Sequence, residues 1–187
     1  MEAIDEDVQL MLAFCDGDAR AFETLFERWS ARLLHYLERM LRDRGAAEEL
    51  TQEVFLRVHR SRDRYRAEAR FSTWLYRIAT NLALNELRRP HRRDPHTSVD
   101  EAPELAAYSP AVVAVVHARR ESESVREVLE ELPEKQRAAL LLAALDGCSY
   151  AEIAETLEVS EKAVKALVHR ARTGLATKLA ERKEAAV

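Results

Sequence analysis

The stretch GCSYAEIAETLEVSEKAVKALVHRARTGLATKL, residues 147–179, decides the fold expected for the C-terminal part of this chain. Ser149 and Glu152 have the spacing of a capping box, which predicts the start of a short helix. After a turn at residues 158–159, Ser160 predicts the start of a longer helix. The longer helix turns these polar side chains outward: Lys162, Lys165 and His169, with Arg170 and Arg172 on its flanks. A short helix, a tight turn and a longer basic helix are typical of a helix-turn-helix, whose second helix enters the major groove of DNA.

The residues before this stretch predict two more helices and a linker. Val125–Glu131 and Glu134–Leu145 have helical character and are separated by Pro133. The other four prolines fall within 21 residues that lack helical periodicity: Pro90, Pro95, Pro103 and Pro110. Such a stretch is typical of a linker between domains. We therefore expect a first domain, a linker and a second domain at residues 1–90, 91–120 and 121–187.

The N-terminal part also predicts helices. Asp18 can cap a long helix whose apolar residues recur at steps of three and four, which predicts one buried stripe: Phe22, Leu25, Phe26, Trp29, Leu33, Leu37, Met40 and Leu41. Gly45 separates it from an expected helix over Ala46–Arg60, and Ser72 can cap a third helix that runs to Arg89. With only four glycines and five prolines in 187 residues, a turn-rich β fold is excluded. The expected fold class is all-α.

The third helix has two contrasting faces. One is expected to be buried: Trp74, Leu75, Ile78, Ala79 and Leu82. The opposite one is expected to face outward: Arg77, Asn81, Leu84 and Arg88. Just upstream, Tyr65, Phe71, Trp74 and Tyr76 interleave with Arg64, Arg66 and Arg70, a pattern suited to single-stranded nucleic acid, because bases stack on rings and phosphates bind arginine. The same residues are equally compatible with an ordinary core beside a solvated basic face.

The charge distribution restricts how the chain could bind DNA. Lys and Arg number 29 against 33 Asp and Glu, a net charge of −4. Autonomous binders of duplex DNA are normally basic, because phosphate neutralisation supplies much of their affinity. Locally the balance differs: residues 1–27 hold eight acidic and one basic residue, whereas residues 57–93 hold eleven arginines and three acidic residues. This asymmetry indicates nucleic-acid contact that depends on a partner.

Other function classes find little support in the sequence. Cys15 and Cys148 are too few for a disulfide scaffold and lack metal-ligand spacing; Cys148, at a helix start, leaves a redox role open beside that of an inert thiol. No glycine-rich phosphate loop, HExxH or nucleophile elbow occurs, so we expect no catalytic residue, metal or cofactor. An acidic start argues against a signal peptide, and the longest apolar run, Ala138–Leu145, is too short for a membrane span. We expect a cytoplasmic protein without membrane insertion.

Three motifs together resemble sigma factors of the sigma-70 class, in the extracytoplasmic-function branch. They are AAEELTQEVFLRVHR at 46–60, FSTWLYRIATNLALNELRR at 71–89 and LPEKQRAALLLAALDGCSYAEIAETLEVSEKAVKALVHRARTGL at 132–175. The resemblance covers Ala19–Arg89 and Glu121–Leu179, and it implies a protein that binds core RNA polymerase and directs initiation at specific promoters.

The resemblance also implies three sets of site residues. The residues implied in docking on core polymerase are Glu48, Glu49, Leu50, Gln52, Glu53 and Phe55. The residues implied in melting the promoter −10 element and capturing its single strand are Tyr65, Phe71, Arg77, Asn81 and Asn85. Arg88 is added to this set because it lies on the same outward face of the third helix. The residues implied in recognition of the −35 duplex are Lys162, Lys165, Ala166, Leu167, His169 and Arg170. An anti-sigma protein is a further partner found in this family.

The chain departs from the family pattern at three positions. Many members have a small hydroxylated residue and an Arg where this chain has Ala166 and Leu167, and Leu167 is expected to pack inward. Asn85 replaces an Asp found in many members. The main alternative is a stand-alone regulator with a LuxR-like helix-turn-helix, because residues 149–168 suit that family too. That alternative leaves the motifs of residues 19–89 unexplained.

Overall fold

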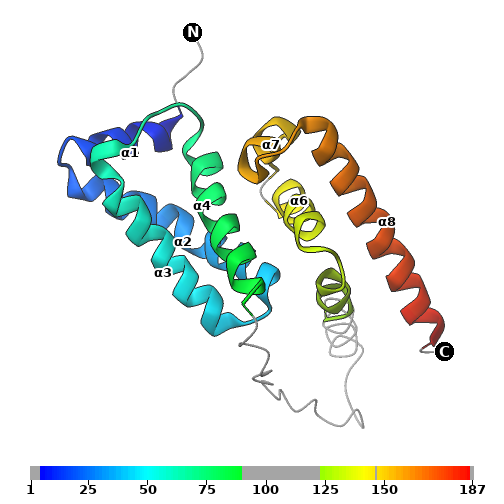
Figure 1. Ribbon diagram of the computed structural model, residues 1–187. Coiled ribbons are helices and arrows are strands. Elements are labelled where there is room, and N and C mark those ends of the chain that lie inside the picture. The colour runs from blue at the N-terminus through cyan, green and yellow to red at the C-terminus, as the bar shows by residue number, and fades with distance from the viewer. Residues whose placement is uncertain (1–4, 90–122, 146, 186–187) are drawn as a thin grey trace, which may run out of the picture.

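The computed structural model describes residues 5–89, 123–145 and 147–185, and every regular element in these ranges is a helix. The N-terminal part contains α1 (Glu6–Cys15), α2 (Ala19–Leu41), α3 (Arg44–Arg60), the short 3-10 helix η1 (Arg62–Arg64) and α4 (Phe71–Leu87). These elements, called the N-terminal bundle below, pack against one another (Figure 1), and their buried apolar side chains belong to the core of the molecule. The expected all-α class is confirmed for the described residues.

Each of the first three helices has an aspartate as its N-cap. The short carboxylate side chain accepts a hydrogen bond from a backbone N–H group that has no partner within the helix. The Asp18 carboxylate accepts a hydrogen bond from the backbone N–H of Arg20 at 3.0 Å, so the predicted start of α2 is confirmed. Asp43 accepts one from the N–H of Ala46 at 2.9 Å, so α3 begins at Arg44. The sequence interpretation placed this start two residues later, because it treated Gly45 as a helix breaker.

The interpretation of α4 was wrong in two respects. Its N-cap is Arg70, with no side-chain cap, whereas Ser72 lies inside the first turn. Leu84, expected to face outward, is 7% exposed. Leu75 and Ala79 are buried as predicted, and Trp74, Ile78 and Leu82 are half-buried. The reason is that α4 packs against α2 and α3 on one side and against α7 on another, so more than one stripe is covered.

Buried polar contacts fix the bundle's internal register. The hydroxyls of Tyr36 on α2 and Thr80 on α4 lie 2.8 Å apart in the core, where neither is exposed. The indole N–H of Trp29 donates to the carboxylate of Asp7 at 3.0 Å, which ties α1 to α2. Satisfied buried hydrogen bonds of this kind favour one packing arrangement over alternatives.

The C-terminal helices comprise residues 123–130, α6 (Glu134–Leu145), α7 (Tyr150–Leu157) and α8 (Glu161–Ala185). The capping box that starts α7 is present as predicted: Ser149 accepts from the N–H of Glu152 and the Glu152 carboxylate accepts from the N–H of Ser149. Glu158, with φ +53, ends α7 in the left-handed region, and Ser160 accepts from the N–H of Ala163 at 3.2 Å. These local contacts build the predicted helix-turn-helix from α7 and α8.

The two groups of helices pack against each other, with α7 against α4 and α6 against α2 (Figure 1). The expected linker at residues 91–120 lies outside the described residues. Among the helices that the structure describes, none combines the length and apolar character needed to cross a membrane.

Candidate nucleic-acid and polymerase interface

The outward side of α3 carries most of the residues implied in polymerase docking. Glu48, Glu49 and Gln52 are exposed, and Leu50 and Glu53 are partly exposed. Arg57 donates from Nε to the Glu53 carboxylate at 2.7 Å, and this hydrogen bond holds the pKa of Glu53 below its ordinary value. The face is therefore anionic at neutral pH and also offers an amide, a combination that can pair with basic helices of a partner.

Phe55 does not belong to this outward side. It is 4% exposed, and its ring packs edge-to-face on Phe26 with centroids 4.7 Å apart. Its burial corrects the expectation of a direct contact. The apolar residues actually exposed here are Phe26 and Leu56, at 44% and 49%. Sequence reasoning assigned Phe26 to the buried stripe, because the helical period alone does not show where that stripe ends.

An aromatic and basic pocket opens beside the start of α4. It has a volume of about 280 Å³ and these lining residues: Ser61, Arg64, Tyr65, Arg66, Glu68, Ala69, Thr73, Trp74, Arg77 and Glu155. The Tyr65 ring meets the Trp74 ring edge-to-face, with centroids 5.0 Å apart. Part of the predicted aromatic and arginine pattern is thus gathered around one cavity, whereas Phe71 and Tyr76 are buried and Arg70 does not line it. Glu155 comes from α7 and could not have been found from the local sequence.

The polar end of Tyr65 is removed from water. Its hydroxyl is buried without a hydrogen-bond partner, and burial raises its pKa to about 12. The phenol therefore stays neutral at any physiological pH, so the ring adds no negative charge to a pocket with three arginines. Neutral aromatic surface beside cationic side chains is what stacking on a nucleobase requires.

Phe71, one of the residues implied in binding the −10 element, is buried in the structure. Its ring is 0% exposed and packs between Trp29 and Trp74, at centroid distances of 6.3 and 5.9 Å. A base cannot stack on a ring enclosed in this way, so the expectation of a direct contact is corrected. Phe71 instead supports the Trp74 ring that lines the pocket.

All but one of the remaining implied DNA residues on α4, its C-cap and α8 are exposed. On α4 and its C-cap, the exposed side chains are Arg77, Asn81, Asn85 and Arg88. On α8 they are Lys162, Lys165, Ala166, His169 and Arg170. Leu167 is half-buried and packs against the apolar core, as the sequence predicted. The accessible side chains of α8 begin in its first turn, the part of a recognition helix that reads base edges.

Two segments match known protein families. Residues 25–93 match the family described as Sigma-70 region 2, and residues 122–175 match Sigma-70, region 4. The chain is 30% identical to the RNA polymerase sigma-H factor of Pseudomonas aeruginosa, over 91% of this chain and 92% of that protein. It is 32% identical to the ECF RNA polymerase sigma-E factor of Escherichia coli K12, over 87% of this chain and 88% of that protein.

Solved structures show the same fold. CnrH, in complex with the cytosolic domain of CnrY, is similar with a TM-score of 0.73 and 24% identity, covering 95% of this chain and 99% of that one. RpoE from Bartonella quintana, in complex with the anti-sigma factor NepR, is similar with a TM-score of 0.66 and 20% identity, covering 86% and 98%. From the sequence matches, this chain belongs to the sigma-70 family of RNA polymerase sigma factors, in its extracytoplasmic-function branch.

Proposed function

We propose that this chain binds core RNA polymerase, recognises the −35 duplex with α8 and holds an unpaired base of the −10 element beside Tyr65 and Trp74. The observation that carries the proposal is the pocket of about 280 Å³ that joins these rings to Arg64, Arg66 and Arg77. Its rings offer stacking surface for a base and its guanidinium groups offer partners for phosphates. The chain itself makes no covalent bond, because the polymerase synthesises the RNA. Since the chain acts together with the polymerase, we expect it in the cytoplasm.

The division of labour follows from the surfaces. The anionic side of α3, with Gln52 and Glu53, docks on the polymerase, and Phe26 and Leu56 add apolar contact at its edge. Arg77, Asn81, Asn85 and Arg88 position the separated strand, because Arg and Asn suit bidentate contacts with phosphates and base edges. Lys162, Lys165, His169 and Arg170 contact the −35 element, and an anti-sigma protein that restrains the chain is a further expected partner.

The acidic balance of the chain fits this function. With a net charge of −4, the free chain should bind duplex DNA weakly. Bound polymerase would hold the −10 and −35 surfaces of the chain at the separation of the two promoter elements. Once one surface has bound its element, binding of the other would be intramolecular, which multiplies the affinity for the promoter. Tight promoter binding should therefore require the polymerase.

The test compares three double variants for binding to bacterial core polymerase by size-exclusion chromatography. Gln52→Ala/Glu53→Ala should weaken binding at least about tenfold, because it removes the centre of the docking surface. Gln9→Ala/Glu23→Ala, two exposed residues on α1 and α2, is the matched control and should bind as the wild type does.

Arg77→Ala/Asn81→Ala should retain polymerase binding but lose promoter opening, measured by permanganate reactivity of unpaired thymines. Loss of polymerase binding in this variant, with a folded chain by circular dichroism, would contradict the assigned division of labour. Failure of the wild type to bind core polymerase would overturn the proposed function itself.

A further inference from the structure

A series of four aromatic rings leads from the core of the N-terminal bundle to the pocket. Its buried members are Trp29 of α2 and Phe71 of α4, whose ring centroids lie 6.3 Å apart. Phe71 in turn lies 5.9 Å from Trp74, and Trp74 lies 5.0 Å from Tyr65, again between centroids. Trp74 and Tyr65 line the pocket. The two rings that a ligand can reach are therefore continuous with two rings that it cannot reach.

A carboxylate of α1 holds the buried end of this ring series. Asp7 is 8% exposed, and its Oδ2 accepts a hydrogen bond from the indole N–H of Trp29 at 3.0 Å. Its Oδ1 accepts a hydrogen bond from Nη1 of Arg28 at 2.5 Å. A hydrogen bond to a charged acceptor is stronger than one between neutral groups, and removal from water strengthens it further. The indole of Trp29 is therefore fixed at its polar edge as well as by packing.

The other contacts of Trp29 show how its orientation reaches the pocket. The guanidinium carbon of Arg32 lies 5.4 Å from the ring centroid, and the ring of Tyr76 meets that of Trp29 edge-to-face at 6.0 Å. Side chains in a close-packed core have no spare volume, so a ring that turns displaces its neighbours. An indole that loses its bond to the carboxylate would displace Phe71, and Phe71 would displace Trp74.

We propose that Asp7 is a positioning residue for the pocket, which acts through Trp29 and Phe71 to hold the ring of Trp74 in the orientation that a stacked base requires. Helix α1 would then serve the site although it contributes no lining residue. A ring that is already held in place costs less free energy to order when a ligand binds. The inference rests on the proposed function in naming a base as the ligand of Trp74.

The first experiment observes Trp74 without any ligand, by fluorine NMR of the full chain labelled with 5-fluorotryptophan. The chain has two tryptophans, so two signals are expected, and Trp29→Phe assigns them. Asp7→Ala should shift or broaden the signal of Trp74 as well as that of Trp29. A folded Asp7→Ala chain with an unchanged Trp74 signal would overturn the proposal. If circular dichroism shows that this variant is unfolded, Asp7→Asn, which keeps a neutral acceptor, should move the Trp74 signal less but detectably.

Glu6→Ala is the matched control for both experiments. Glu6 also pairs with Arg28, at 3.2 Å, and its removal takes the same charge from the same turn of α1. Its side chain is 76% exposed, and the indole N–H of Trp29 is bonded to the neighbouring aspartate instead. Glu6→Ala should therefore leave the Trp74 signal where it is in the wild type. A shift equal to that of Asp7→Ala would show that charge alone is responsible and would overturn the proposal.

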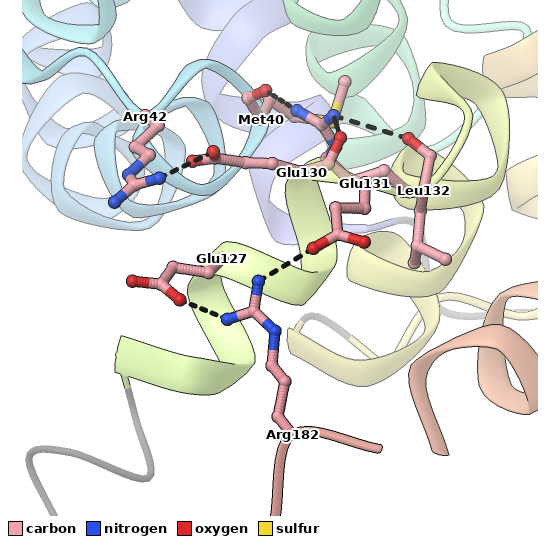
Figure 2. Close-up of polar contacts among 8 residues, drawn as sticks. Met40, Arg42, Glu127, Glu130, Glu131, Leu132 and Arg182 are labelled. Carbon is pink, nitrogen blue, oxygen red and sulfur yellow. Dashed lines mark hydrogen bonds and ion pairs between the residues drawn. The ribbon is translucent and has the colours of Figure 1, made fainter. Parts of the chain in front are cut away.

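The contact between the two groups of helices provides a second control. Arg42 of the N-terminal bundle pairs with the carboxylate of Glu130 at 2.7 Å (Figure 2). This contact also bears on the pocket, because Glu155 of α7 lines it. The ring series lies wholly within the N-terminal bundle, so Asp7→Ala should move the Trp74 signal equally in an Arg42→Ala background. An effect that vanishes in that background would overturn the proposed path.

The second experiment measures what the orientation of Trp74 contributes to binding. Core polymerase carrying the chain is titrated with fluorescein-labelled oligothymidine. Asp7→Ala should weaken binding about threefold to tenfold, as part of the loss that follows removal of a stacking ring. In a Trp74→Ala background the same change should have no further effect, because the ring through which it acts is absent. Losses that add in the double variant would overturn the proposal.

The two experiments separate this inference from the proposed function. If the wild-type complex binds no strand while the Trp74 signal still depends on Asp7, the proposed function fails and the path through the ring series stands. If the strand binds but neither the signal nor the affinity depends on Asp7, the proposed function stands and the positioning role fails.

Discussion

At the scale of single residues, Tyr65 combines a structural cost with a functional position. Its hydroxyl is buried without a hydrogen-bond partner, while its ring meets Trp74 at the rim of the pocket. A buried hydroxyl that loses its hydrogen bonds to water destabilises the fold. The proposed contact with a base therefore involves the ring and not the hydroxyl.

Tyr65→Phe should raise the free energy of unfolding at pH 7 by up to about 1 kcal/mol, because it removes the unsatisfied hydroxyl and keeps the ring. The wild type should also lose stability in alkali. Its Tyr65 pKa is raised to about 12, so the advantage of the neutral phenol is fully present below the ordinary value of 10.0 and is lost as the pH rises through about 12.

Urea unfolding between pH 7 and 11.5 measures both effects. The phenylalanine variant should keep more of its stability in alkali, and Tyr76→Phe, at another buried tyrosine, is the matched comparison. A variant less stable than the wild type at pH 7 would show that the Tyr65 hydroxyl is bonded in solution.

At the scale of elements, local signals predicted helix starts well where a side chain makes the cap. Asp18, Ser149 and Ser160 each cap the helix that their position predicted. The start of α4 was missed because Arg70 caps it with backbone geometry alone. Burial was harder to predict than helicity, because Leu84 is covered by contacts made between segments far apart in the sequence.

The capping box gives a test at this scale. Ser149→Ala should lower the free energy of unfolding by about 1 kcal/mol, whereas Ser72→Ala, at the position wrongly expected to cap α4, should change it little. Burial alone would raise the pKa of Glu152, but its hydrogen bonds with Ser149 and the charge of Arg70 hold it below its ordinary value.

The contribution of the ionised Glu152 is therefore present above its ordinary pKa and is lost as the pH falls through the lowered one. The effect of Ser149→Ala should accordingly shrink in acid. Thermal unfolding of both serine variants at pH 7 and pH 4 measures this. Equal losses in the two variants at pH 7 would contradict the assignment of the cap.

At the scale of the whole molecule, the sequence predicted the function and the exposed basic residues but not their arrangement. Arg77 lies on α4 and Glu155 on α7, far apart in the sequence, and nothing in either local pattern shows that they line one pocket. The burial of Phe55 and Phe71 has the same origin, because both rings are enclosed by partners from other helices. Contacts between distant segments thus decide which of the motif residues are available to a ligand.

The most direct measurement is transcription from the organism's own fragmented genomic DNA by core polymerase, with and without this chain, followed by sequencing of transcript 5′ ends. We predict new start sites that depend on the chain and share two sequence blocks at a constant separation. These starts should disappear with Gln52→Ala/Glu53→Ala and persist with Gln9→Ala/Glu23→Ala. A folded chain that adds no start sites, or adds sites without a shared pair of blocks, would contradict the proposed role in promoter recognition.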